Sequence, residues 1–494
     1  MNIMSNTQRD LLKEKLDQLQ CHFTWSPQKE TIDLEDVMYR LQDAISLGVK
    51  YQATCHNQLA FINCLQGKNK EAIQNLNEAE EILKDNHKDE FERSIIITYG
   101  NFAWVHYHMG QLTEAQSYLD KLEMICKSLS DGPRYTAMIP EVYGEKGWSL
   151  LRSASQYYEE AKECFKKALV EDPDNTEWIM GYATALSRLE LFSGTPENRK
   201  QCQSVKHLRR VLELDPDNSM AMVLLALKLQ QLKQKETAAE LVERALQKTP
   251  DFPYVLRYAA KFYRLEEDVE KAIGLLKKAL EITPLSAFLH DQIAMCYRIK
   301  LDELINNPRS RNPRNPAFRQ KAKLFNQCKD HFGKAFQYRP KTAIKSQLDF
   351  ACVCVRNGEN SKAKEIYSNL LKLDDIRPEN LQRICLRAGT FEMYQRRCES
   401  NAISLFLKGL KVEYDSSERK KCHDKLKKWT EKNLCKDPHD SKALGMKGLL
   451  YQLNGNKAKA IEYFEKALEF DHENEEYLSA LYELRLSIEE HNDT

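Results

Sequence analysis

Residues 216–249 read PDNSMAMVLLALKLQQLKQKETAAELVERALQKT, and residues 250–283 read PDFPYVLRYAAKFYRLEEDVEKAIGLLKKALEIT. Both stretches are 34 residues long, both begin with proline, and Pro284 opens a third copy. Alanine recurs at fixed offsets, in the pairs Ala226 and Ala260, Ala238 and Ala272, and Ala245 and Ala279. Small side chains let two helices cross closely, and proline ends a helix because it cannot continue the hydrogen-bond ladder. This period and pattern predict tetratricopeptide repeats, each a pair of antiparallel helices.

Further copies of this small-residue ladder occur on both sides of the quoted stretch. They are centred on Ala60, Ala103, Ala161, Ala351 and Ala402, and the clearest copy spans residues 441–472. With about ten such units, the sequence predicts an all-α solenoid whose units stack into a superhelix. We expect a helical segment over residues 1–50, a repeat array over 51–284, a repeat with a basic insertion over 285–343 and a C-terminal array over 344–494.

The composition fits this class and excludes several others. Glycine and proline number only 17 and 15 among 494 residues, which disfavours β-rich and disordered chains. No apolar run is long enough to span a bilayer, and the N-terminus lacks the apolar core of a secretion signal. The 14 cysteines therefore predict free thiols in a reducing compartment, and we expect a cytoplasmic protein. Because the net charge is only +1, a binding site for a polyanion has to be local.

Two segments carry an excess of basic residues. Residues 305–329 contain seven Arg or Lys and no Asp or Glu, within the 56-residue interval from Pro284 to Pro340. We interpret this segment as a solvated loop, with a basic flap near a polyanion as the alternative. Residues 408–436 contain ten Lys or Arg and five acids, and we expect a solvated helical surface there.

The first helix of each unit is expected to line the concave face of the solenoid. Groove-facing residues follow from helical periodicity, once the small residue at the helix crossing is taken as the reference. Around Ala260 this rule places Tyr254, Arg257, Lys261 and Arg264 in the groove. Neighbouring units add Phe288, Asp291, Met295 and Arg298, then Trp148 with Arg152, Thr184 with Arg188, and Trp104 with Tyr107 and His108.

Cations interleaved with aromatic rings suit single-stranded nucleic acid, because phosphates pair with the cations and bases stack on the rings. Arginine also binds phosphate through two parallel hydrogen bonds, which lysine cannot do. One alternative is that the aromatic residues only pack one repeat on the next. Another is an adaptor that binds peptides or proteins. The chaperone-binding kind of adaptor has Lys and Asn where this chain has Arg257 and Lys261, which favours nucleic acid.

Four segments resemble the interferon-induced proteins with tetratricopeptide repeats. They are CHFTW at 21–25, GNFAWVHYHMGQLTEAQSYLDK at 100–121, LLALKLQ at 224–230 and LRYAAKFYR at 256–264. The resemblance extends over essentially the whole chain and implies a cytoplasmic, interferon-induced antiviral protein of innate immunity. Such proteins hold the 5′ end of single-stranded RNA, with a triphosphate or a cap lacking ribose methylation, in a basic central tunnel. They thereby sequester viral RNA or block its translation.

The resemblance also implies roles for single residues. Contacts to phosphate or to the RNA backbone fall on Tyr158, Arg188, Tyr254, Arg257, Lys261 and Gln292, with Arg152 standing where the family usually has lysine. Among these, Tyr158 and Gln292 rest on the resemblance alone. Trp148 is implied as the residue that stacks on a base or a cap.

Periodicity extends this set along the same helix faces. Arg264 and Arg298 become further candidate phosphate ligands, and Phe288 becomes a second candidate stacking residue. The C-terminal LSALYELRLSI is similar to the triphosphate-binding branch of the family, whereas residues 100–121 are more like the cap-sensing branch. The preferred 5′ end is therefore left open.

Several positions differ from the family pattern. Tyr39 and Asp43 replace Thr or Arg and Gln, and Asp291 replaces the second His of a His-His-Gln run. Met220 likewise replaces a tyrosine. Acids that face a triphosphate repel it unless a cation bridges them, so these changes weigh against triphosphate binding more than against RNA binding. Glu35 occupies the family's acidic position and is a candidate ligand for such a divalent cation. No other cofactor is expected.

The remaining features concern assembly and catalysis. Phe464 and Leu468 stand where the family's hetero-oligomerisation motif has Tyr and Leu, which weakens the prediction of assembly with other family members. Nucleotide-binding loops and metalloprotease motifs are absent, and the cysteines and histidines lack metal-binding spacing. We therefore predict a non-enzymatic protein that binds RNA 5′ ends, with no DNA or membrane partner. The alternative is a repeat adaptor or scaffold for proteins, including related family members.

Overall fold

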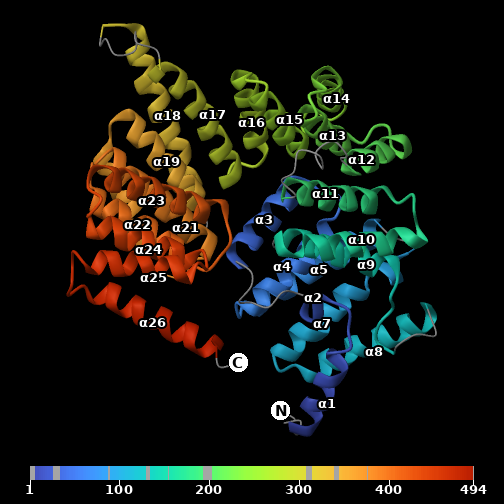
Figure 1. Ribbon diagram of the computed structural model, residues 1–494. Coiled ribbons are helices and arrows are strands. Elements are labelled where there is room, and N and C mark those ends of the chain that lie inside the picture. Colours follow the sequence, from blue (N-terminus) through green and yellow to red (C-terminus); the bar gives the residue numbers. More distant parts are fainter. Residues whose placement is uncertain are drawn as a thin grey trace. The chain divides into compact units, whose positions relative to one another are not determined.

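The structure is a computed structural model that describes residues 6–25, 34–86, 90–129, 134–153, 155–192, 203–306, 314–338, 344–374 and 376–492. Every element in these residues is helical, which confirms the predicted all-α repeat fold (Figure 1). The chain forms two compact units. Unit 1 comprises Met1–Glu303 and Asn326–Thr342, and unit 2 comprises Leu304–Phe325 and Ala343–Thr494.

Unit 1 is built mainly from consecutive helix pairs. Its helices are α1 (Asn6–Leu16), α2 (His22–Trp25), α3 (Leu34–Ser46), α4 (Gln52–Leu65), α5 (Asn69–Asn86), α6 (Phe91–Ser94), α7 (Ile96–His108), α8 (Leu112–Leu129), α9 (Pro140–Ser153), the short 3₁₀ helix η2 (Ser155–Tyr157), α10 (Tyr158–Glu171), α11 (Thr176–Phe192), α12 (Gln203–Leu214), α13 (Ser219–Gln231), α14 (Lys235–Lys248), α15 (Pro253–Leu265) and α16 (Val269–Ile282). The closest packing joins α4 to α5, α7 to α8, α9 to α10, α11 to α12, α13 to α14 and α15 to α16.

Two long helices belong partly to each unit, and the rest of the chain completes unit 2. The shared helices are α17 (Ala287–Asn306) and α18 (Pro316–Tyr338). Unit 2 continues with α19 (Ile344–Asn357), α20 (Asn360–Leu371), α21 (Pro378–Tyr394), α22 (Glu399–Lys411), α23 (Ser417–Lys436), α24 (Ser441–Leu453), α25 (Lys457–Leu468) and α26 (Glu475–Asn492).

The alanine ladder of the sequence lies where paired helices cross. Ala226, Ala260, Ala294, Ala238, Ala272, Ala245 and Ala279 are all buried, with at most 1% of their surface exposed. Pro216, Pro250 and Pro284 lie in the loops that follow α12, α14 and α16, each the second helix of a pair. The structure thus confirms both parts of the repeat prediction.

Glycine replaces alanine where a larger neighbour fills the crossing. A Cβ atom on Gly147 would lie 2.9 Å from the nearest ring atom of Phe165, and one on Gly181 would lie 2.4 Å from that ring. These distances are too short for an alanine, so α9, α10 and α11 meet around the phenylalanine ring. This close packing positions the C-terminal half of α9, which carries two candidate RNA contacts.

Helix starts in the repeats are set by capping side chains. The Asn218 side chain accepts a hydrogen bond from the Ala221 amide at the start of α13, and Asp268 accepts one from the Lys271 amide at the start of α16. Such caps satisfy amides that lack a partner within the helix. Pro253 occupies the first turn of α15, where its missing amide hydrogen carries no penalty.

For the two basic segments, the structure contradicts one interpretation made from the sequence and confirms the other. Residues 307–313, within the 305–329 segment, lie outside the described residues. The interpretation of this segment as a loop was wrong from Pro316 onward, because Leu324, Phe325 and Cys328 form a buried stripe on α18. In the 408–436 segment, eight of the ten Lys and Arg side chains are exposed, which confirms a solvated helical surface.

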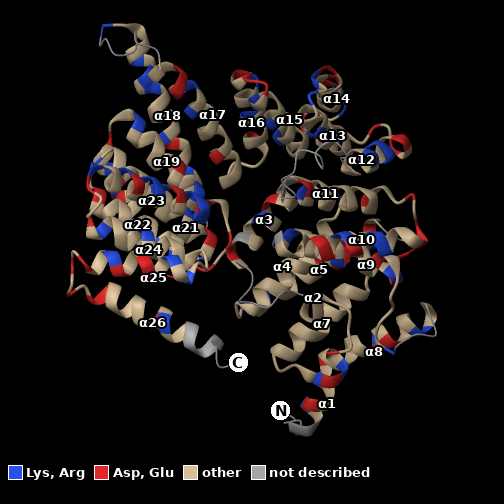
Figure 2. Cartoon of the chain, in the orientation of Figure 1, with Lys and Arg blue, Asp and Glu red and all other residues tan. Residues whose placement is uncertain are grey.

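Charge is mixed over the whole surface. Figure 2 shows Lys and Arg interspersed with Asp and Glu in both units, consistent with the net charge of +1. None of the described helices combines the length and the apolar character required to cross a lipid bilayer.

Candidate nucleic-acid interface

Unit 1 encloses a cavity of about 310 Å³ between α3 and the first helices of successive repeats. Four arginines line it, namely Arg40, Arg152, Arg188 and Arg257, and Asp43 is the single acid among the described lining residues. We call this space the arginine cavity. Its aromatic lining consists of Tyr51, Trp148, Tyr254, Tyr258 and Phe288. Six of the residues proposed from the sequence as RNA contacts therefore meet at one place.

Arg152, in the last turn of α9, is buried beside two aromatic rings. Its guanidinium carbon lies 4.1 Å from the ring centroid of Tyr51 and 5.4 Å from that of Trp148, and the residue is 8% exposed. Both terminal nitrogens, Nη1 and Nη2, are buried and make no hydrogen bond of good geometry, although the guanidinium opposes the rise in pKa that burial gives the nearby Tyr51 hydroxyl. The rings attract the positive charge, but buried N–H groups without an oxygen acceptor remain costly. A ligand with anionic oxygens would satisfy these donors, because the arginine fork matches phosphate.

Trp148, one turn before Arg152, is packed between two other rings. It is 4% exposed, it stacks on Tyr51 at a centroid distance of 4.1 Å, and it meets Phe165 edge-on at 5.2 Å. Because Tyr51 covers one face of the indole, an RNA base can stack only on the other face or after Tyr51 has moved. The stacking role of Trp148 stays a prediction.

Arg188 and Arg40 are fixed by the C-terminal end of α9. Nη1 of Arg188 donates to the Leu151 carbonyl at 2.6 Å, and Nη2 of Arg40 donates to the Ser153 carbonyl at 3.2 Å. Carbonyls in the last turn of a helix lack partners within the helix and attract cations. Tyr158 does not line the cavity, but its ring centroid lies 5.2 Å from the guanidinium carbon of Arg188. Tyr158 therefore contacts a cavity arginine without lining the cavity itself.

Arg257 on α15 is the fourth arginine of the cavity lining. Its guanidinium carbon lies 3.6 Å from the ring centroid of Phe288 and 5.6 Å from that of Tyr258. Burial raises the pKa of Tyr258, but the charges of Arg257 and Arg188 and the hydrogen bond with Tyr254 bring it below its ordinary value. Burial and the neighbouring Tyr258 raise the pKa of Tyr254 well above its ordinary value, so the two hydrogen-bonded tyrosines shift in opposite directions.

Lys261 and Arg264 continue the same face of α15 beyond the cavity lining. Lys261 is exposed and Arg264 is half-buried. Although solvent reaches Lys261, partial loss of hydration beside the protein and the charges of Arg264 and Arg257 lower its pKa. The two side chains thus extend the positive charge along α15, and their contact with RNA stays a prediction.

The remaining predicted contacts lie outside the arginine cavity. On α17, Gln292 and Arg298 are half-buried, and Nε2 of Gln292 donates to Oδ2 of Asp291 at 3.2 Å. Glu35 on α3 is half-buried and also absent from the lining. The described residues include no group of three His, Cys, Asp or Glu side chains that could hold a metal ion. The cation role of Glu35 stays a prediction.

Three charged or aromatic lining residues were missed by the sequence analysis. Arg40 belongs to α3 and Tyr51 to the loop before α4, and neither segment is part of the repeat ladder from which groove positions were counted. Tyr258 does belong to a counted helix. Its spacing of four residues from Tyr254 was the signal that could have placed both rings on one face.

Unit 2 has a pocket of its own, of about 640 Å³, between α19, α21 and α23. Its charged lining consists of Lys345, Arg383, Arg387, Lys421 and Lys425 with the acids Asp349 and Glu418. Glu418 lies 3.6 Å from Arg383, and Nζ of Lys425 donates to the Tyr394 hydroxyl at 3.2 Å. Part of this charge is thus paired. The two buried terminal nitrogens of Arg152, which make no hydrogen bond of good geometry, make the unit 1 cavity the stronger candidate.

Comparison with known proteins agrees with the repeat architecture. Tetratricopeptide repeat models match residues 140–175 and 441–474, and the model of the Psidin N-terminal TPR repeats region matches residues 194–304. The human antiviral innate immune response effector IFIT1 is 39% identical over 458 residues, covering 92% of this chain and 95% of the relative. Human interferon-induced protein with tetratricopeptide repeats 2 is 36% identical over 478 residues, covering 94% and 97%.

Solved structures extend the likeness to three dimensions. The human IFIT1 dimer with m7Gppp-AAAA superposes with a TM-score of 0.75 at 38% identity, covering 93% of this chain and 99% of the other. The human IFIT1 dimer with PPP-AAAA gives a TM-score of 0.71 at the same identity and coverage. These similarities confirm the resemblance read from the sequence. The chain therefore belongs to the family of interferon-induced proteins with tetratricopeptide repeats.

Proposed function

We propose that this chain captures the 5′ end of single-stranded RNA and holds its phosphates in the arginine cavity of unit 1. The observation that carries the proposal is the guanidinium of Arg152, which is buried with two terminal nitrogens that lack a hydrogen-bond partner. Phosphate oxygens at a 5′ end supply the acceptors that this group lacks. The solved complexes of human IFIT1 with m7Gppp-AAAA and PPP-AAAA support the same ligand class.

The charge and size of the cavity support the proposal that an RNA end, and not an internal segment, is the ligand. Four arginines converge on a space of about 310 Å³, and they include two that are fixed to the carbonyls of α9. A 5′ triphosphate, or the triphosphate bridge of a cap, concentrates more negative charge in such a space than an internal phosphodiester does. In this proposal, the positive charge of the groove, which was predicted from the sequence, is what selects an RNA 5′ end over an internal phosphodiester.

The proposed role is capture without chemistry. Bound RNA whose 5′ end is enclosed is unavailable to other proteins. We therefore propose that the protein sequesters non-self RNA, carrying a triphosphate or a cap without ribose methylation, or blocks its translation.

One binding panel tests this function. The same single-stranded RNA is prepared with triphosphate, unmethylated cap, ribose-methylated cap, monophosphate or hydroxyl at its 5′ end. We expect tight binding for the triphosphate or for the unmethylated cap, and the weakest binding for the hydroxyl end. Equal affinity for all five ends would contradict the proposal.

A second candidate function, assembly with another repeat protein, is favoured by the last helix. On α26, Leu478, Tyr482 and Leu486 are 47%, 66% and 41% exposed and follow one another at intervals of four residues. They form an exposed apolar stripe on α26, and such stripes are prone to association. Phe464 of the family's assembly motif is instead buried against Gly448. If α26 drives assembly, Tyr482→Glu will lower the molecular mass measured by light scattering.

A further inference from the structure

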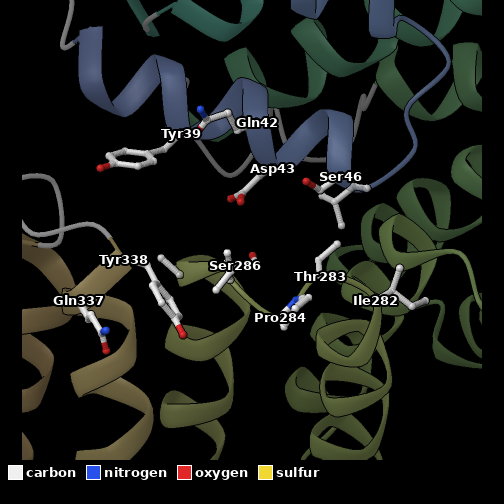
Figure 3. Close-up of a pocket in the computed structure, with 13 residues that line it drawn as sticks. Tyr39, Gln42, Asp43, Ser46, Ile282, Thr283, Pro284, Ser286, Gln337 and Tyr338 are labelled. Carbon is white, nitrogen blue, oxygen red and sulfur yellow. The ribbon is translucent and has the colours of Figure 1, made fainter.

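A second cavity of unit 1 adjoins the arginine cavity and has a different chemistry. It measures about 690 Å³ and lies between α3, the loop from α16 to α17 and the C-terminal end of α18. Figure 3 shows Tyr39 and Asp43 on α3, facing Tyr338 and Ser286 across the space. We call this space the tyrosine pocket. Its volume is within the range of small-molecule sites, about 300–1,000 Å³.

The lining of the tyrosine pocket is unsuited to phosphate. Asp43 is the only charged residue among its thirteen lining residues, all of which belong to the described part of the chain. The other polar groups are the amides of Gln42 and Gln337 and three hydroxyl groups of Ser and Thr. Two aromatic rings, neutral donors and acceptors, and one carboxylate are the groups that bind an unpaired nucleobase by stacking and edge contacts.

The two cavities share part of their walls. Asp43 and Leu47 line both the arginine cavity and the tyrosine pocket. A ligand whose phosphates contact the arginines therefore has neutral, aromatic space directly beside it. A nucleotide is built in the same way, with an anionic part attached through a sugar to a flat, uncharged base.

Tyr338 is supported by a pair of histidines. Its ring centroid lies 5.7 Å from that of His290, and Nδ1 of His290 lies 3.0 Å from Nδ1 of His331. Nε2 of His290 is 3.3 Å from the Pro284 carbonyl, so it is the donor there and Nδ1 is left to accept from His331. This network holds the His290 ring against Tyr338, which gives the pocket a supported aromatic wall.

We propose that the tyrosine pocket binds a base of the RNA held in the arginine cavity, and that Asp43 makes it selective for guanine. The inference rests on the proposed function. A carboxylate only accepts hydrogen bonds, and the Watson–Crick edge of guanine presents two parallel donors, N1–H and N2–H. Adenine and cytosine present one amino group on that edge, and uracil presents one N3–H. Guanine is the base that matches both carboxylate oxygens at once.

The test varies one base at a time in an RNA whose 5′ end is known to bind. Each of the first four nucleotides is set in turn to guanine, adenine, cytosine, uracil or inosine, and dissociation constants are measured by fluorescence anisotropy. Inosine isolates the contact because it keeps N1–H but lacks the 2-amino group. At one position we expect guanine to bind about tenfold more tightly than inosine, the scale of a hydrogen bond to a charged group.

One variant and a matched control test whether the guanine preference arises in the tyrosine pocket. Asp43→Asn replaces one acceptor by a donor, so the ratio between inosine and guanine dissociation constants should fall below about two. Glu240→Gln removes an exposed acid of α14 that lines neither cavity and should leave that ratio unchanged. Ratios are compared because loss of a negative charge near the arginines also strengthens binding of every RNA.

The outcomes separate this inference from the proposed function. If binding depends on Arg152 and Arg257 but is indifferent to all of the first four bases, guanine selection by Asp43 is overturned and RNA capture stands. A guanine preference that persists in Asp43→Asn also overturns it. If RNA binding does not depend on those arginines, the proposed function itself fails.

Discussion

The guanidinium carbon of Arg152 lies 4.1 Å from the ring centroid of Tyr51, so a cation of α9 is held against an aromatic ring from the start of α4. The ring stabilises the charge and orients the side chain, while its terminal N–H groups remain without acceptors. An arginine arranged in this way loses little conformational freedom when it binds an anion. This preorganisation gives the first prediction.

Replacing Arg152 by methionine should separate binding from stability. We expect Arg152→Met to weaken binding of 5′-triphosphate or capped RNA by at least about tenfold, since charged hydrogen bonds are lost. The melting temperature should be unchanged or higher, because a buried cation with unpaired donors has been removed. Arg209→Met, on an exposed position of α12, is the matched control and should change neither quantity. A lower melting temperature with full RNA binding would make Arg152 a structural residue.

The salt dependence of binding should report the number of phosphates held by arginines. Each neutralised phosphate of a single strand contributes about −0.7 to the slope of log K against log salt concentration. Four arginines line the cavity, so we expect a slope near −3 in filter-binding titrations. A slope close to zero would show that the cations do not touch phosphate.

Charge reversal at the cavity wall should abolish binding. Arg188→Glu and Arg257→Glu each turn an attraction into a repulsion in a confined space where water screens poorly. Arg209→Glu makes the same charge change outside the cavity and should retain parental affinity. Gel shifts in which either cavity variant binds like its parent would show that the arginine cavity is not the RNA site.

Trp148 should distinguish the two kinds of 5′ end. Complete truncation of a buried tryptophan costs about 3–5 kcal/mol of stability, so the informative change is Trp148→Phe, which keeps a ring against Tyr51 and Phe165. If the protein reads caps, this smaller ring should weaken binding of capped RNA more than that of triphosphate RNA, because cap guanine depends on stacking. Equal, small losses on every 5′ end would leave Trp148 as a packing residue.

Glu145 should make the stability of the fold depend on pH. Burial raises the pKa of Glu145 to about 8, although a hydrogen bond from Asn57 and the charge of Arg152 oppose the shift. Because its ordinary pKa is lower, the free energy of unfolding should fall as pH rises from about 4.5 to 8. Glu145→Gln removes this titration and should raise the melting temperature at pH 8.5 but not at pH 4.5. The same difference from the parent at both pH values would contradict the assignment.

The sequence predicted the repeats because their geometry is local. Pro216, Pro250 and Pro284 end helices through their own backbone chemistry, and the alanines are small because two helices cross at each of them. Counting from these crossings also predicts that Arg152, Arg188 and Arg257 lie in one groove. The structure brings those three into a single cavity lining.

The rest of the site depends on contacts that periodicity does not describe. Arg40 and Tyr51 come from α3 and the loop after it, which pack across the repeats instead of belonging to one. Conversely, Lys261 and Arg264 satisfy the periodic rule but lie beyond the cavity, because the rule identifies a helix face and not a depth along it. The tyrosine pocket combines Tyr39 with Tyr338, nearly 300 positions later in the sequence, so no local pattern could reveal it.

Unit 1 is discontinuous in sequence, and this order has a consequence for shortened forms of the protein. Its last piece, Asn326–Thr342, follows the chain's first passage into unit 2. A cleavage product or splice form that stops at Glu303 would retain every arginine of the cavity but would lack Tyr338, together with the histidine that steadies His290. Such a form would keep Asp43 but lose Tyr338, the aromatic wall that faces it across the tyrosine pocket. Under the two proposals above, truncation would thus remove half of the base site and leave the cations for the phosphates in place.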